Sequence, residues 1–182
     1  MRLQAGTRAP EFSVTDFQGR SHSLEQYRGQ WLLVQFYRYS GCPMCDLRLH
    51  DFAREYPALE SQGLRVLAFF HSSDERLRRH LRERALPFPV VPDPARLVYR
   101  RFGVETSVPR LLLSTLKPSF YWDWLRSMAH GYFGSADWNM TTLPADFLIA
   151  PDQSIRIAYY GRDIGDHVPA DQVGRELAEH NP

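Results

Sequence analysis

Residues 31–45 read WLLVQFYRYSGCPMC, an almost uninterrupted apolar run followed by a short loop and the only two cysteines of the chain. An apolar run of this length is typical of a strand that is buried on both faces of a sheet. Pro43 suits the first turn of a helix, where its missing N–H leaves no hydrogen bond unmade. The stretch therefore predicts a central strand over 31–37 that leads into a helix at the cysteine motif.

Cys42 is the expected nucleophile of this motif. A thiol at the first turn of a helix faces unpaired backbone N–H groups and the positive end of the helix dipole, and both favour the thiolate. Cys45 follows within one helical turn, so the two sulfurs can form a disulfide with little movement of the backbone. We therefore expect Cys42 to react first and Cys45 to resolve the product.

Length and charge limit the classes of protein to consider. With 182 residues, the chain is expected to form one domain over 1–182, with a core that needs no structural disulfide. Its 22 basic and 21 acidic residues nearly cancel, which favours neither nucleic acid nor a membrane surface as a partner. The N-terminus lacks an apolar leader, and the apolar runs are too short to span a bilayer. We expect a soluble, cytoplasmic protein, in which a CxxC pair is more often redox-active or metal-binding than structural.

Apolar spacing places further elements after the cysteines. A helix is predicted over 45–63, a second buried strand over 64–70, and a basic helix over 72–86 that opens with a capping box of Ser72 and Glu75. The other predicted elements are, in chain order, a hairpin over 9–27, a short helix over 95–102, a strand over 108–113, a hairpin of strands 146–150 and 154–160, and a terminal helix over 169–180. This order predicts an α/β fold with a central mixed β-sheet flanked by helices.

An aromatic segment over about 114–142 interrupts this order as a predicted helical insert. Its large aromatic residues are Phe120, Tyr121, Trp122, Trp124, Tyr132, Phe133 and Trp138. Such side chains serve as core, as an interface or as the wall of a binding site. Three roles thus stand open for the insert: packing, self-association as a homodimer, and contact with substrate.

Several motifs around the cysteines resemble one family. The stretches Ala9-Pro10-Glu11-Phe12 and Tyr27-Arg28-Gly29, with the strand that ends at Tyr37, resemble the N-terminal block of the peroxiredoxins, the alkyl hydroperoxide reductase and thiol-specific antioxidant superfamily. Residues 93–104 resemble a helix of the same family, and 143–149 followed by Gly165-Asp166-His167 resemble the C-terminal half of its divergent CxxC-containing group. The resemblance covers nearly the whole chain outside the aromatic insert.

The resemblance implies a thioredoxin-like fold and a thiol peroxidase. In such an enzyme the thiolate of Cys42 would attack the O–O bond of a peroxide, and Cys45 would condense with the sulfenic acid to form a disulfide. An external thiol reductant, such as a thioredoxin- or glutaredoxin-type protein, would then reduce the disulfide. Neither cofactor nor metal is implied.

The chain departs from the family pattern at two places. Peroxiredoxins carry a proline seven residues and a threonine three residues before the reactive cysteine, where this chain has Gln35 and Tyr39. They also carry an arginine near the strand over 146–150, where Leu143-Pro144 stands here. Pro144 instead resembles the cis-proline of thioredoxins, which faces the cysteine pair and docks extended substrate backbone.

Nearby residues are candidates to replace the missing groups. Arg38 would place a positive charge near the thiolate, and Tyr39 or Ser40 would donate the missing hydrogen bond. Arg110 and His167 are further candidates, with a charge at a strand edge and a structural hydrogen bond as the respective simpler interpretations.

Two alternatives to peroxide reduction stay open at this point. A thioredoxin-like thiol–disulfide oxidoreductase would use the same cysteines on protein or small-molecule disulfides, with Pro144 shaping the groove. A Cu(I)- or Zn(II)-binding module would use the two soft thiolates as ligands, although the seven histidines show no paired metal spacing.

Overall fold

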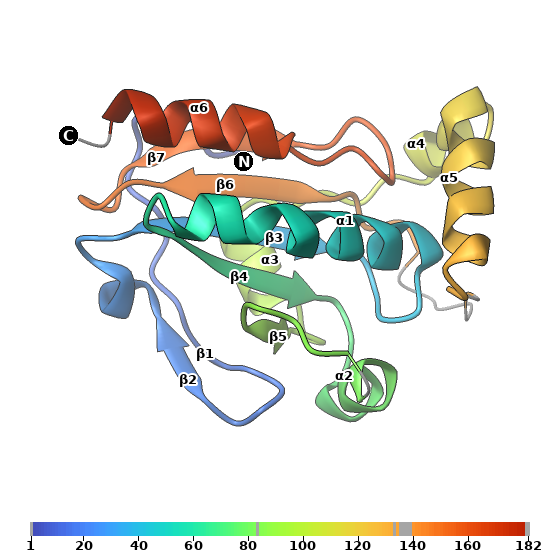
Figure 1. Ribbon diagram of the computed structural model, residues 1–182, viewed down its shortest axis with the longest axis horizontal. Helices are drawn as coiled ribbons and strands as arrows, with labels where there is room; N and C mark the ends of the chain where they lie inside the picture. Colours follow the sequence, from blue (N-terminus) through green and yellow to red (C-terminus); the bar gives the residue numbers. More distant parts are fainter. Residues whose placement is uncertain (1, 83, 133, 135–139, 181–182) are drawn as a thin grey trace.

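A five-stranded mixed sheet lies at the centre of the computed structural model, which describes residues 2–82, 84–132, 134 and 140–180 (Figure 1). In spatial order its strands are β5 (Val90–Pro92), β4 (Leu64–Phe70), β3 (Trp31–Tyr37), β6 (Ala145–Ile149) and β7 (Ile155–Tyr160). Strand β3 pairs in parallel with β4 and antiparallel with β6, as expected for the strand with the longest apolar run. The predicted central mixed sheet is therefore confirmed.

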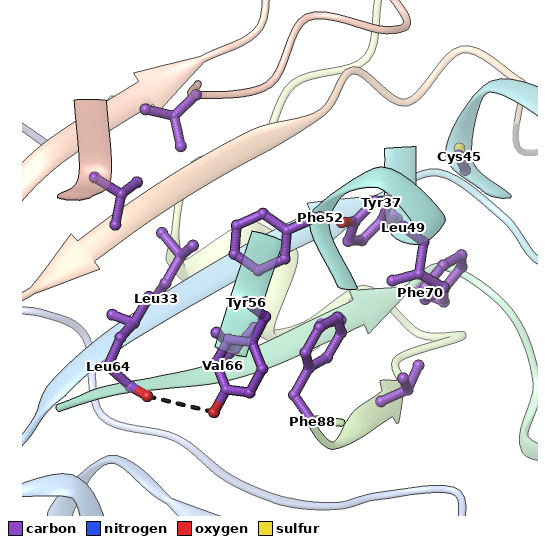
Figure 2. Packing of buried hydrophobic residues seen from close by; sticks show 14 of the residues in the cluster. Leu33, Tyr37, Cys45, Leu49, Phe52, Tyr56, Leu64, Val66, Phe70 and Phe88 are labelled. Atoms are coloured by element: carbon purple, nitrogen blue, oxygen red, sulfur yellow. Dashed lines mark hydrogen bonds between the residues drawn. The ribbon is translucent and has the colours of Figure 1, made fainter. Parts of the chain in front are cut away.

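Helix α1 (Pro43–Glu60) lies along one face of the sheet and α6 (Ala170–His180) covers the same face beside it (Figure 1). Figure 2 shows Phe52 and Tyr56 of α1 packed over Leu33 and Val66 of the sheet. The hydroxyl of Tyr56 also donates a hydrogen bond to the carbonyl oxygen of Leu64. This packing fixes the position of α1, and with it the position of the cysteines at its first turn.

The opposite face of the sheet carries its own apolar cluster. Phe36, Phe69 and Phe147 of the sheet pack there against Tyr99 and Phe102, which lie on and next to α3 (Leu97–Arg101). The predicted N-terminal hairpin is also present, as β1 (Ser13–Thr15) and β2 (Ser21–Ser23), followed by a 3-10 turn, η1 (Leu24–Tyr27). The sheet is thus covered on both faces, and β3 is buried along its whole length.

Two helices stand at the end of the sheet where β3 runs into α1: α4 (Val108–Ser114) and α5 (Pro118–Ala129) (Figure 1). The predicted strand over 108–113 is wrong, because this segment is α4. Ser107 caps the helix by accepting a hydrogen bond from the backbone N–H of Arg110, and Pro109 lies in its first turn, where it breaks no hydrogen bond. The predicted helical insert is present as α5, while Phe133 and Trp138 lie outside the described residues.

Helix α2 (Asp74–Leu81) is shorter than the helix predicted over 72–86, and its N-cap lies one residue later than the predicted cap Ser72. Its N-cap is Ser73, whose hydroxyl accepts from the backbone N–H of Arg76. The hydroxyl of Ser72 is instead occupied by Ser40. The helix ends well before Leu86, so both predicted ends were wrong. None of the helices in the described ranges is long and apolar enough to cross a membrane.

Candidate redox site

Cys42 is the N-cap of α1, and its sulfur receives the first free donor of the helix. The backbone N–H of Cys45 lies 3.3 Å from the Cys42 sulfur and donates to it. The thiol of Cys45 donates to the same sulfur, so the two side chains are in contact as unlinked thiols. Pro43 occupies the first turn of the helix as predicted. The geometry therefore matches the expected pair, one turn apart on one helix.

The surroundings of the two thiols separate their acidities. Burial raises the pKa of Cys42, but the Cys45 thiol, the Arg38 guanidinium and the Cys45 backbone N–H together outweigh burial, so the pKa lies below that of an ordinary thiol. Burial raises the pKa of Cys45, and the nearby Cys42 sulfur raises it further. Cys42 is thus the more acidic of the two thiols.

A cavity of about 220 Å³ gives Cys42 access to small molecules although its side chain is 1% exposed. Arg38, Cys42 and Pro43 are among the residues that line it. The rest of the lining is largely apolar and consists of Tyr39, Met44, Leu111, Thr115, Phe120, Trp124, Met140 and Ile164. The more acidic thiol therefore faces an apolar chamber with one cationic side chain.

Of the predicted supporting residues, Arg38 and Tyr39 line the cavity and Ser40 does not. Arg38 is buried next to the thiols, and their charges raise its own pKa although burial lowers it. Its Nε atom has no hydrogen-bond partner among the described residues. Tyr39 lines the cavity, whereas the Ser40 hydroxyl lies 3.1 Å from the hydroxyl of Ser72. The geometry does not favour the expectation that Ser40 serves the thiolate, because its hydroxyl is bonded to Ser72, where it ties the cysteine loop to the segment after β4.

Pro144 does not have the expected geometry. No cis peptide bond occurs among the described residues, so the predicted likeness to a cis-proline is wrong. Pro144 precedes β6, accepts a hydrogen bond from the backbone N–H of Gly161, and does not line the cavity at Cys42. Its place is set by the pairing of β6 with β7.

Arg110 and His167 both lie away from the cavity. Arg110 is on α4 and forms an ion pair with Glu105 over 3.4 Å. His167 Nδ1 lies 2.9 Å from a carboxylate oxygen of the buried Asp146, and its ring packs on Tyr37. The simpler structural role is therefore the one that the geometry favours for His167.

Sequence reasoning missed a buried charged cluster that begins at Asp46. This carboxylate directly follows Cys45 and lies 2.7 Å from His80 Nε2 and 2.9 Å from Arg84 Nη1. Both partners come from α2 or its end, more than 30 residues along the chain. An acidic residue in the first turn of a helix is common, so the local sequence does not indicate that Asp46 has partners elsewhere in the chain.

Metal ligands do not gather around the two cysteines in the part of the chain that the structure describes. The one group of three or more His, Cys, Asp or Glu side chains found there is Glu176, Glu179 and His180 on α6. Arg156 is already paired with Glu176. Within the described residues, the geometry gives the metal-binding alternative no further ligands beside the two cysteines.

Comparisons with known proteins agree on one family. Residues 5–158 match the model of the AhpC/TSA family. Similar chains include a putative peroxiredoxin of Mycobacterium tuberculosis, 32% identical over 102 residues, and peroxiredoxin Bcp of Escherichia coli K12, 31% identical over 102 residues. Each match covers 56% of this chain and 65% of the relative, so the matched part is somewhat less than two thirds of these proteins.

Solved structures resemble the whole chain more closely in fold than in sequence. A mutant of PrxQ from Xylella fastidiosa has a TM-score of 0.72 at 17% identity, covering 100% of this chain and 99% of that one. A thiol peroxidase from Chromobacterium violaceum has a TM-score of 0.70 at 18% identity, covering 100% and 90%. The predicted thioredoxin-like fold is therefore confirmed.

Proposed function

This chain belongs to the AhpC/TSA family, and from that premise we propose that it is an oxidoreductase that reduces peroxides with the thiolate of Cys42. The observation that carries the proposal is the placement of Cys42. The Cys42 sulfur has a lowered pKa, lies near the charge of Arg38 and lines an accessible cavity. A sulfur whose pKa is lowered and which is reachable is the nucleophile that attack on an O–O bond requires.

The first step transfers one oxygen atom. The Cys42 thiolate attacks one peroxide oxygen, the S–O bond forms as the O–O bond breaks, and the leaving oxygen takes a proton to depart as an alcohol or water. Negative charge develops on the leaving oxygen during this step. The Nε–H donor of Arg38 has no partner among the described residues, and a cation beside the reacting atoms stabilises that charge. In this proposal Arg38 donates to the peroxide the hydrogen bond that the threonine hydroxyl gives in other peroxiredoxins.

The second step closes the disulfide. Cys45 attacks the sulfenic acid sulfur of Cys42, the S–S bond forms, and hydroxide leaves as water with the Cys45 proton. The thiols are already in contact, so little rearrangement is needed. An external dithiol, such as a thioredoxin- or glutaredoxin-type protein, must then supply two electrons to restore the thiols. Such a cycle suits a reducing compartment such as the cytoplasm.

Stopped-flow oxidation of the wild type, Cys42→Ser and Cys45→Ser tests the proposal. We expect hydrogen peroxide to convert both wild-type thiols to one disulfide. Cys45→Ser should complete one turnover and retain a sulfenic acid that dimedone traps, whereas Cys42→Ser should not react. Oxidised lipoamide in a parallel set of reactions tests thiol–disulfide exchange with the same proteins.

Two results would overturn the roles. If Cys42→Ser reacts and Cys45→Ser does not, the nucleophile is Cys45. If the wild type reacts with oxidised lipoamide and not with peroxide, the protein is a thiol–disulfide oxidoreductase.

We also propose that the homodimer expected through the aromatic insert forms at the start of that insert together with α4, where residues 112–116 would contact a second copy of the chain. Leu112 and Leu113 of α4 and Leu116, two residues after its end, are all exposed. The nearby cations are paired within the chain, Arg110 with Glu105 and Lys117 with Asp163, which leaves little charge to repel a copy.

Sedimentation equilibrium tests this association. We expect a dimer for the wild type and a monomer for Leu112→Glu with Leu116→Glu. Leu97→Glu, an exposed position on α3, is the control and should leave the dimer intact. A monomeric wild type would rule the association out.

A further inference from the structure

Helix α4 and the aromatic insert contribute a wall of the Cys42 cavity. Leu111 of α4 and Phe120 and Trp124 of α5 line the cavity together with Arg38 and Cys42. Helix α5 stands beside the first turns of α1, where its Arg126 is paired with Asp51 (Figure 1). After α5 the chain passes close to the motif again, since a Cβ atom on Gly134 would lie 2.9 Å from Pro43. The wall and the cysteine motif are thus held as neighbours by contacts outside the cavity.

The lining of the cavity does not match hydrogen peroxide. That molecule is little larger than water and offers only hydroxyl groups, which gain nothing from contact with leucine, methionine and aromatic side chains. A cavity of about 220 Å³ has room for a carbon skeleton beside the peroxide group. An organic hydroperoxide with an apolar substituent would direct its O–O group to Cys42 and Arg38 and bury that substituent against the wall.

Trp124 is the side chain best placed to contact that apolar substituent. It lines the cavity, yet 43% of its surface is exposed, so it has apolar area that a ligand can still cover. Burial of an aromatic side chain against an apolar ligand is a large contribution to binding. Trp122, two residues away on the same helix, is 66% exposed and does not line the cavity.

We propose that Trp124 is a specificity-determining residue that favours hydroperoxides with a bulky apolar substituent over hydrogen peroxide. The inference rests on the proposed peroxide reduction and assigns the insert its third candidate role, contact with substrate. Trp124 touches the substituent and takes no part in cleaving the O–O bond. Its removal therefore acts on binding of one substrate class and leaves the reactivity of Cys42 unchanged.

Steady-state kinetics of the reduced protein, with dithiothreitol as electron donor, test the proposal on cumene hydroperoxide and hydrogen peroxide. For Trp124→Ala we expect kcat/KM for cumene hydroperoxide to fall about 10-fold or more through KM, the range typical of lost apolar pocket contacts. The value for hydrogen peroxide should stay within about 2-fold. Trp124→Leu, which keeps an apolar side chain, should restore most of the preference. Trp122→Ala is the matched control and should leave both values unchanged.

A non-reactive probe separates binding from chemistry. The alcohol 2-phenyl-2-propanol, the product of cumene hydroperoxide, should bind to the reduced wild type and about 10-fold more weakly to Trp124→Ala. NMR chemical shifts report the binding and also show whether the variant stays folded. If Trp124→Ala unfolds the insert, Trp124→Gln, which replaces the apolar ring with a polar side chain, carries the comparison. A ratio of kcat/KM values between the two peroxides that equals the wild-type ratio in Trp124→Gln would then overturn the proposal.

Other outcomes are equally decisive. Equal loss with both peroxides would mean that Trp124 positions the cysteine loop, and an unchanged ratio would mean that the wall does not select substrate. Either result overturns this inference and leaves peroxide reduction standing. A wild type that reacts with neither peroxide would overturn the proposed function itself.

Discussion

The hydroxyl of Tyr99 lies 2.5 Å from the carbonyl oxygen of Tyr37 and 2.9 Å from that of Phe69. Tyr37 is the last residue of β3 and immediately precedes the loop that carries the cysteines. Phe69 lies near the matching end of β4. One buried side chain from α3 thus joins two neighbouring parallel strands on the side opposite α1, at the edge of the sheet where the redox site begins.

Tyr99→Phe removes this link with little change of volume. Because the two carbonyl oxygens lose a buried donor, we expect the free energy of unfolding to fall by about 1–2 kcal/mol. Urea denaturation measures the difference. Tyr121→Phe, at an exposed position on α5, is the control and should change stability by less than about 0.5 kcal/mol. Equal stability of the two variants would contradict the prediction.

Arg38 is expected to set the acidity of the reactive thiol. Burial raises the pKa of Cys42 while Arg38 and the Cys45 groups lower it, so Arg38→Met should move that pKa upward. Less thiolate is then present near neutral pH, and oxidation and alkylation should both become several-fold slower and shift to higher pH. The rate of iodoacetamide reaction against pH measures the shift.

Arg38→Lys serves as the control for this prediction. It keeps the positive charge, so the pH profile should stay closer to that of the wild type than the profile of Arg38→Met. A profile that is unchanged in Arg38→Met would show that the helix end and Cys45 are sufficient to lower the pKa of Cys42.

Asp46 is buried, and its two partners come from a distant part of the chain. Asp46→Ala leaves the partly buried Arg84 without its carboxylate, so we expect a loss of about 3 kcal/mol in the free energy of unfolding. Asp74→Ala breaks a half-exposed pair with Arg78 and should cost less than about 1 kcal/mol. Thermal and urea unfolding compare the two variants, and similar losses would count against the cluster.

Acid should act on the N-terminal hairpin through Asp16. Burial raises the pKa of Asp16, but hydrogen bonds from His22 and Arg20 outweigh burial, so the folded pKa lies below its usual value. A depressed carboxyl pKa stabilises the folded state above the unfolded value of about 3.9, and this stability is lost as the pH falls through the folded pKa. Between about pH 5 and pH 2 the wild type should therefore lose more stability than Asp16→Asn.

Urea unfolding at a series of pH values measures this difference. Glu179→Gln, an exposed carboxyl group on α6, is the control and should follow the wild type. Parallel curves for the wild type and Asp16→Asn would mean that Asp16 does not contribute to acid sensitivity.

Local sequence was sufficient to predict most elements and the core of the site. The apolar run over 31–37 predicts a strand, and Pro43 between two cysteines predicts a helix start, because both signals act within a few residues. The segment over 108–113 shows the limit of this reasoning. Its leucines suit a buried strand, but they lie on α4, where Leu112 and Leu113 are exposed and Ser107 provides the cap.

The site residues also divide into those whose neighbours follow from sequence spacing and those whose neighbours depend on the fold. That Arg38 lies near Cys42 follows from four residues of spacing, but the partners of Ser40, Pro144 and His167 depend on which strands and loops meet in space. Ser40 is tied to Ser72 across two strand ends, and His167 to Asp146 across a sheet edge. Sequence spacing carries no information on such contacts.

The sequence by itself determined the arrangement of the candidate site: two cysteines one helical turn apart, behind an apolar strand, with an arginine close by. Only the tertiary structure decided which thiol faces a cavity, that α5 supplies the cavity wall, and that Asp46 is paired with α2. The physical reason is range. Helix caps and dipoles act over one turn and are written in adjacent residues, whereas burial, cavities and buried ion pairs arise when segments far apart in the chain are packed together.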